Sequence, residues 1–139
     1  MTFEEKGKWV YLLSSIAGFM TYAGIILNRA QDTPITEVSY VSTLLWVIGI
    51  SVAVTIIGQI AIAISKPSEA DKKDERDKGI NRYGDLIGGI VLGIAMIVPL
   101  GLTLAEANHF WIANAMYGAF LLLAIVSSAV KIVAYRRGL

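Results

Sequence analysis

The sequence contains no cysteine and few charged residues for its length. The absence of cysteine excludes disulfides, thiolate metal sites and cysteine nucleophiles. Charged residues make up 17% of the 139 residues and hydrophobic residues 55%, whereas a typical soluble domain is roughly 25% charged. A net charge of +1 gives no overall field that would attract nucleic acid. We therefore expect a lipid bilayer around the chain and no nucleic-acid partner.

Catalytic motifs are also absent. The chain has no G-x-S-x-G, no H-E-x-x-H, no P-loop and no glycine-rich dinucleotide turn. Its only histidine, His109, follows Glu106 with the Glu-x-x-His spacing of di-metal helical bundles. Such sites need several more carboxylates inside the bundle, and this sequence does not supply them. We predict that the chain is not an enzyme and that it holds no cofactor and no metal.

Four long apolar runs account for most of the sequence, at residues 9–27, 38–64, 84–105 and 110–133. A helix needs about 20 residues to cross the hydrocarbon core of a bilayer, and no run has a charged residue near its centre. Helices of a soluble bundle would each need a charged face, which these runs lack. The pattern predicts an all-α integral membrane protein, in which residues 1–139 form one domain, a four-transmembrane-helix bundle.

Lysine and arginine are distributed very unevenly around these runs. Eleven of the twelve lie at the N-terminus, in the second connection and at the C-terminus, and Arg29 is the only one in the other two connections. Basic residues collect in cytoplasmic segments of membrane proteins. An even number of spans puts both termini on the same side. We therefore predict cytoplasmic termini and a charged cytoplasmic loop at residues 65–83.

Small residues in the third run indicate how the helices pack. Lipid chains are as apolar as leucine, so helices in a bilayer associate through close backbone approach at small residues. Gly84 and Gly88 are four residues apart, as are Gly89 and Gly93, and we predict that all four serve helix packing. Pro99 removes a backbone donor within the same run, which predicts a kink there.

The loop carries the most distinctive motif of the chain. Asp74, Glu75, Arg76 and Asp77 are followed by Ile80 and lead directly into the glycine-rich third run. This pattern resembles the D-E-R-D-x-x-I motif of a group of small uncharacterised bacterial and archaeal membrane proteins, a domain of unknown function with four predicted spans. The resemblance implies a prokaryotic origin and a plasma-membrane location, and it implies no activity.

Several roles for the loop are compatible with its residues. Acids and bases alternate too closely for a calcium loop or for a polybasic segment that binds anionic lipid. A docking surface for a cytoplasmic protein, an internal latch that holds helix ends together, and a solvated turn all remain open. The residues that would serve the first two roles are Asp74, Glu75, Arg76, Asp77 and Arg82.

From these observations we expect a noncatalytic membrane scaffold or regulatory protein that docks a partner through the charged loop. The alternative is a small transporter or channel for a neutral or apolar solute, assembled as a homo-oligomer through the glycine face of the third run. Coupled transport is disfavoured because no ionisable residue lies at the centre of a run. Small four-helix multidrug exporters, for comparison, carry a glutamate in their first span.

The predicted orientation has a direct test in reporter fusions. A reporter that is active only in the periplasm should stay silent when fused after Lys73 and become active when fused after Thr33, because the basic segments are held inside. Reporter activity in cells expressing each fusion at equal level is the measurement. Activity after Lys73 with silence after Thr33 would reverse the orientation.

Overall fold

A computed structural model describes residues 2–68 and 75–138 of the chain, and its elements are all helical in this part. They are α1 (Phe3–Arg29), the short 3-10 helix η1 (Ile35–Glu37), α2 (Val41–Ser65), α3 (Glu75–Ala95), α4 (Ile97–Leu104) and α5 (His109–Arg137). With α3 and α4 taken together, four helices are long and apolar enough to cross a membrane. This confirms the four long apolar helices predicted from the sequence.

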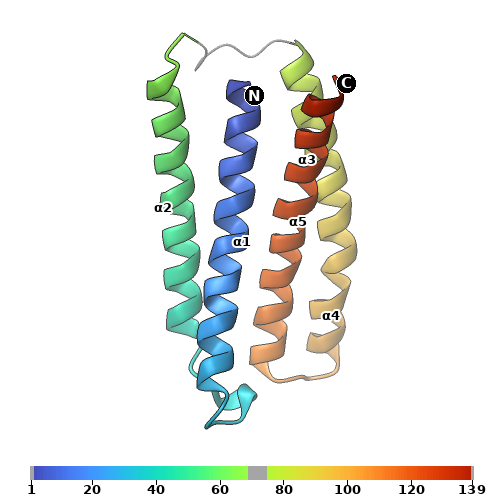
Figure 1. Cartoon of the computed structure of the whole chain (residues 1–139). Helices are drawn as coiled ribbons and strands as arrows, with labels where there is room; N and C mark the ends of the chain where they lie inside the picture. The colour runs from blue at the N-terminus through green and yellow to red at the C-terminus, as the bar shows by residue number, and fades with distance from the viewer. Residues whose placement is uncertain (1, 69–74, 139) are drawn as a thin grey trace.

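The helices stand side by side in a row (Figure 1). α1 packs against α2 on one side and α5 on the other, and α5 also packs against α3 and α4. Among the described residues, α2 makes no comparable contact with α3, α4 or α5. The N- and C-termini lie at the same end of the bundle, which we call the terminal end. η1 and the turn between α4 and α5 lie at the opposite end.

Local signals fix where α1 and α5 start and where α5 stops. The side chain of Thr2 accepts a hydrogen bond from the backbone N–H of Glu5, 3.1 Å away, and Asn108 accepts one from Phe110 at 2.9 Å. Both contacts satisfy donors that the first turn of a helix leaves unpaired. α5 ends at Gly138, whose φ of 72° suits a residue without a Cβ.

Pro99 explains why the third span is divided into α3 and α4. A proline has no N–H to donate to the carbonyl four residues earlier, here that of Ala95. The helix is interrupted at Met96, directly after that carbonyl. Helical hydrogen bonds continue on both sides, from Met96 to Leu92 and from Leu100 to Met96. The break is therefore local, at the place where the sequence predicts a kink.

Much of the helical surface is apolar and uncovered. α2 buries only Thr43 and Val47, while Trp46 and Ile64 are 70% and 73% exposed. An apolar surface of this extent does not stay exposed to water in a soluble monomer. It is the surface expected of helices that are surrounded by lipid.

Polar contacts join the helices within the apolar region. The hydroxyls of Ser14 and Thr55 share a hydrogen bond between α1 and α2, and the amide of Gln59 donates to the carbonyl of Gly7 at 2.9 Å. Between α1 and α5, the hydroxyl of Tyr22 donates to Asn114. Each such bond satisfies groups that lipid could not.

The glycines of α3 divide into two pairs that differ in their surroundings. A Cβ added to Gly84 would lie 2.5 Å from Cγ of Lys131, and one added to Gly88 would lie 2.7 Å from Cδ1 of Leu123. A Cβ on Gly89 or Gly93 would meet no atom within 4 Å. Gly84 and Gly88 therefore allow α3 to approach α5. Among the described residues no packing contact is found for Gly89 and Gly93, so the packing role predicted for them stays a prediction.

This difference predicts unequal effects of the same substitution at adjacent positions. Gly88→Leu should destabilise the bundle by about 1–3 kcal/mol because its side chain overlaps Leu123 and Ser127. Gly89→Leu is the matched control and should leave the melting temperature in detergent almost unchanged. Similar melting temperatures for the two variants would contradict the packing of α3 on α5.

The turn after α4 carries a residue in an unfavourable backbone conformation. Glu106 has a φ of 57°, although glycine usually occupies this position after a helix. Its N–H donates to the carbonyl of Thr103, and the N–H of Ala107 donates to the carbonyl of Leu102. These two bonds are those of a Schellman motif. A side chain in this conformation costs roughly 1–2 kcal/mol.

Replacing Glu106 by glycine should therefore stabilise the protein. We expect Glu106→Gly to raise the free energy of unfolding by about 1 kcal/mol, because glycine adopts this φ without strain. Glu106→Ala is the control, since it removes the carboxylate and keeps the Cβ. Thermal unfolding of both variants in the same detergent is the measurement. A gain for alanine equal to that for glycine would assign the effect to charge.

Candidate functional site

The charged motif begins α3 rather than forming a separate loop. Residues 75–83 are helical and continuous with the apolar part of α3, and the helix passes through Gly79 without interruption. Asp74 lies outside the described residues. Lys78 and Glu75 form an exposed i,i+3 ion pair, with N and O atoms 3.5 Å apart. The first two turns of α3 therefore project the motif from the terminal end as a regular helix.

Arg76 and Asp77 both contact Tyr135, in the last turn of α5. The guanidinium of Arg76 donates to the carbonyl of Tyr135 at 3.1 Å and lies 5.3 Å from the centre of its ring. The hydroxyl of Tyr135 donates to the carboxylate of Asp77 at 2.6 Å. Tyr135 is only 8% exposed. The motif is thus fixed to the end of α5 through a buried aromatic side chain.

The carbonyl that accepts from Arg76 lies near the C-terminal end of α5, and this position strengthens the contact. The last carbonyls of a helix have no partner within the helix and carry partial negative charge. Tyr135 lies two residues before the end of α5 at Arg137. A cation at a helix C-terminus is worth about 0.3–1 kcal/mol when exposed. Arg76 therefore both satisfies an unpaired acceptor and complements its charge.

Two further ion pairs join helices at the terminal end. Lys131 of α5 contacts Asp85 of α3 at 2.6 Å. The aliphatic part of the Lys131 side chain passes over Gly84. Arg136 of α5 pairs with Glu5 of α1, which is only 4% exposed. The last two turns of α5 therefore contact the polar ends of both α1 and α3. We call the residues that make these contacts the terminal cluster: Glu5, Arg76, Asp77, Asp85, Lys131, Tyr135 and Arg136.

Glu75 and Arg82, the other charged site residues that the structure describes, are exposed, as is the neighbouring Lys78. The side chain of Glu75 is 94% exposed and that of Lys78 62%. Arg82 is exposed as well, with no hydrogen bond or ion pair to another residue that the structure describes. The motif therefore has two faces. One face contacts α5, and the other carries Glu75, Lys78 and Arg82 toward the surroundings.

Sequence reasoning missed Glu5 and Tyr135. Glu5 closes a Thr-x-x-Glu capping box that starts at Thr2, and this signal would have extended the first helix to the terminus. The same signal would also have placed Glu5 one helical turn before the first apolar run. The sequence offers no comparable local signal for Tyr135. Its role as a contact depends on the rotation of α5, which no local pattern gives.

The opposite end carries the pair with the Glu-x-x-His spacing. Glu106 and His109 are both exposed. Within residues 2–68 and 75–138, no group of three or more acidic or histidine side chains could hold a metal ion. Arg29, the one basic residue at this end, donates to the carbonyl of Ser39 and the hydroxyl of Thr43. These two hydrogen bonds attach the end of α1 to the connection before α2 and to the first turn of α2.

The contact between Tyr135 and Asp77 predicts a specific loss of stability. Tyr135→Phe removes the donor and leaves the Asp77 carboxylate without this bond, which should lower stability by about 1–3 kcal/mol. Tyr83→Phe is the matched control, because Tyr83 is 56% exposed. Melting temperatures in detergent are compared with that of the unchanged chain. Equal melting temperatures for both variants would show that the contact contributes nothing.

Comparisons with known proteins leave the site to be interpreted from its geometry. The chain matches no protein-family model, no curated protein and no solved structure. The resemblance of its motif to the D-E-R-D-x-x-I group of prokaryotic membrane proteins stays a prediction.

Proposed function

We propose that this chain is a noncatalytic membrane protein that docks a cytoplasmic protein partner on the exposed face of the first turns of α3. The observation that carries the proposal is the division of the motif into two faces. Arg76 and Asp77 are held against Tyr135, while Glu75 and Lys78 are exposed. A scaffold or regulatory role follows from a charged surface that is rigidly attached to a membrane bundle.

Rigidity favours binding at this surface. Association must overcome the entropy lost when flexible segments become ordered, and a surface that is already ordered reduces that loss. Helical hydrogen bonds and the contacts with α5 order the first turns of α3 before any partner arrives. Charges of both signs at the surface would govern partner choice and association rate more than affinity.

The same proposal places both termini in the cytoplasm, at the plasma membrane of a prokaryote. The N-terminus, the second connection and the C-terminus contain eleven of the twelve lysines and arginines, the bias typical of cytoplasmic segments. The prokaryotic assignment rests on the resemblance of the motif. Docking on α3 would then occur where cytoplasmic proteins can reach it.

The test separates the face that carries Glu75, Lys78 and Arg82 from the face that contacts α5. A variant with Glu75→Ala, Lys78→Ala and Arg82→Ala should keep the melting temperature of the bundle, because exposed charges contribute at most about 1 kcal/mol per pair. It should lose the cytoplasmic proteins that cross-link to the unchanged chain in cells. The control is Asp32→Ala with Glu37→Ala, which removes exposed charges at the opposite end.

Quantitative mass spectrometry of the cross-linked proteins is the measurement. Recovery of the same proteins with the triple variant would overturn the docking proposal. Loss with both variants would assign the effect to overall charge. Docking through charges also predicts that raising salt weakens the complex.

A second candidate, a small oligomeric transporter or channel for a neutral or apolar solute, is favoured by a different observation. An apolar groove of about 550 Å³ lies between α1, α2 and α5, with Tyr11, Met116 and Phe120 among its lining residues. Gly89 and Gly93 leave an open strip on α3, through which copies could assemble. Solute flux into liposomes that contain the purified chain tests this candidate, and Gly93→Leu should abolish flux if assembly needs that strip.

A further inference from the structure

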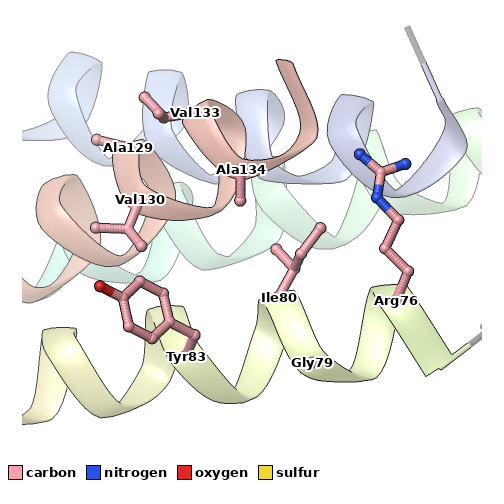
Figure 2. A pocket seen from close by; sticks show the side chains of 8 residues that line it. All are labelled: Arg76, Gly79, Ile80, Tyr83, Ala129, Val130, Val133 and Ala134. Atoms are coloured by element: carbon pink, nitrogen blue, oxygen red, sulfur yellow. The ribbon is translucent and has the colours of Figure 1, made fainter. Parts of the chain in front are cut away.

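A second groove lies at the terminal end, between α3 and α5 (Figure 2). Its volume is about 610 Å³. Ile80 and Tyr83 of α3 face Val130 and Ala134 of α5 along it, and Arg76 lies at one end. Gly79 contributes no side chain, and a Cβ there would meet no atom within 4 Å. The groove is thus apolar along its length, with a cation at its end.

Arg137 adds a second positive charge at the same end. It follows Val133, a lining residue of the groove, by four positions in α5 and is exposed. Residues four apart in a helix lie on the same face, so Arg137 stands one turn beyond the groove wall. In the described first turn of α3, both acids have cationic or hydroxyl partners, since Glu75 pairs with Lys78 and Asp77 accepts from Tyr135. Arg76 and Arg137 therefore leave a net positive charge at this end among the residues that the structure describes.

The groove has the dimensions of a lipid site at a membrane surface. From Arg76 to Tyr83 the helix rises by about 10 Å, which leads from the headgroup level into the hydrocarbon if the terminal end lies at the interface. A groove between helices in a bilayer does not stay empty, because its lining would lose dispersion contacts. Basic pockets between transmembrane helices on the cytoplasmic side are typical sites for anionic headgroups.

We propose that this groove binds one phospholipid with an anionic headgroup. Its phosphate lies between Arg76 and Arg137, and one acyl chain lies along Ile80, Tyr83, Val130 and Val133. A guanidinium has five N–H donors and can serve a carbonyl and a phosphate together. The contacts of Arg76 with Tyr135 hold it in place for this purpose. The site goes beyond partner docking and does not depend on it, since Arg82 and the other exposed charges of the docking face do not line the groove.

The position of Gly79 allows a test that leaves the fold intact. Gly79 lines the groove, and a Cβ at this position would meet no described atom within 4 Å, so we expect Gly79→Leu to place its side chain in the groove with the helix packing unchanged. Gly89→Leu is the matched control, because it adds the same side chain to an open position of α3 outside the groove. The full-length chain is purified in detergent and given phosphatidylglycerol or phosphatidylcholine with identical acyl chains. Bound lipid is counted by native mass spectrometry.

We expect the unchanged chain and Gly89→Leu to retain one phosphatidylglycerol in preference to phosphatidylcholine, and Gly79→Leu to lose it. Arg137→Gln should reduce the preference about fivefold, the equivalent of about 1 kcal/mol per basic residue at an anionic surface, whereas Arg82→Gln should not. Glycerol phosphate, which has the headgroup without the chains, should not displace the lipid.

Three results would overturn the proposal. Undiminished lipid on Gly79→Leu would place the lipid elsewhere. Displacement by glycerol phosphate would indicate an anion site that does not use the groove. A change from dimer to monomer in Gly79→Leu would mean that a second copy of the chain occupies it. None of these results affects the capture of proteins by the exposed face of α3, so the two proposals fail independently.

Discussion

The close approach of α3 to α5 at Gly84 and Gly88 is the contact on which the terminal end depends. Because neither residue has a side chain, the two helix backbones come near enough for Lys131 to pass over Gly84 and reach Asp85. The same approach brings Tyr135 within hydrogen-bond distance of Asp77, two turns earlier in α3. In a bilayer, where leucine gains little from leucine, backbone proximity of this kind decides which helix faces meet.

The remaining contacts are individually small and are spread along α1 and α5. Hydrogen bonds between membrane helices average about 0.6 kcal/mol. The pair Ser14 and Thr55, the bond from Tyr22 to Asn114 and the pair Glu5 and Arg136 therefore hold the row of helices together only as a set. α2 is attached mainly through α1. The motif at the start of α3 is attached to α5, which also packs against α1 and α4, so its orientation is fixed.

The sequence predicted the spans, the interruption near Pro99 and the approach at Gly84 and Gly88, because each follows from local chemistry. Length and apolarity define a span, and a missing N–H defines a break. The sequence alone could not decide which of the two glycine pairs of α3 packs against α5. Gly84 and Gly88 lie on a different face from Gly89 and Gly93, and only the rotation of α3 against α5 selects one of them.

Long-range pairing was equally beyond the sequence. Glu5 and Arg136 are separated by 131 positions, and nothing in either neighbourhood identifies the other. Several groups could accept a hydrogen bond from Arg76, among them carboxylates and the carbonyls at two helix ends. The structure places it on the carbonyl of Tyr135. Such choices depend on the order of the helices in space, with α5 between α1 and α3, which follows from packing and not from chain order.

Helical periodicity explains how one short charged segment can be structural and exposed at once. Adjacent residues in a helix point about 100° apart, so a run of charges cannot share one environment. Arg76 and Asp77 fall on the side of α5, while Glu75 and Lys78 fall outside it. A latch and a docking surface appear as alternatives when residues 65–83 are taken as a loop, whereas the docking proposal assigns them to two faces of the same helix. The inward face fixes the orientation in which the outward face is presented, and that is a property an unstructured charged turn could not provide.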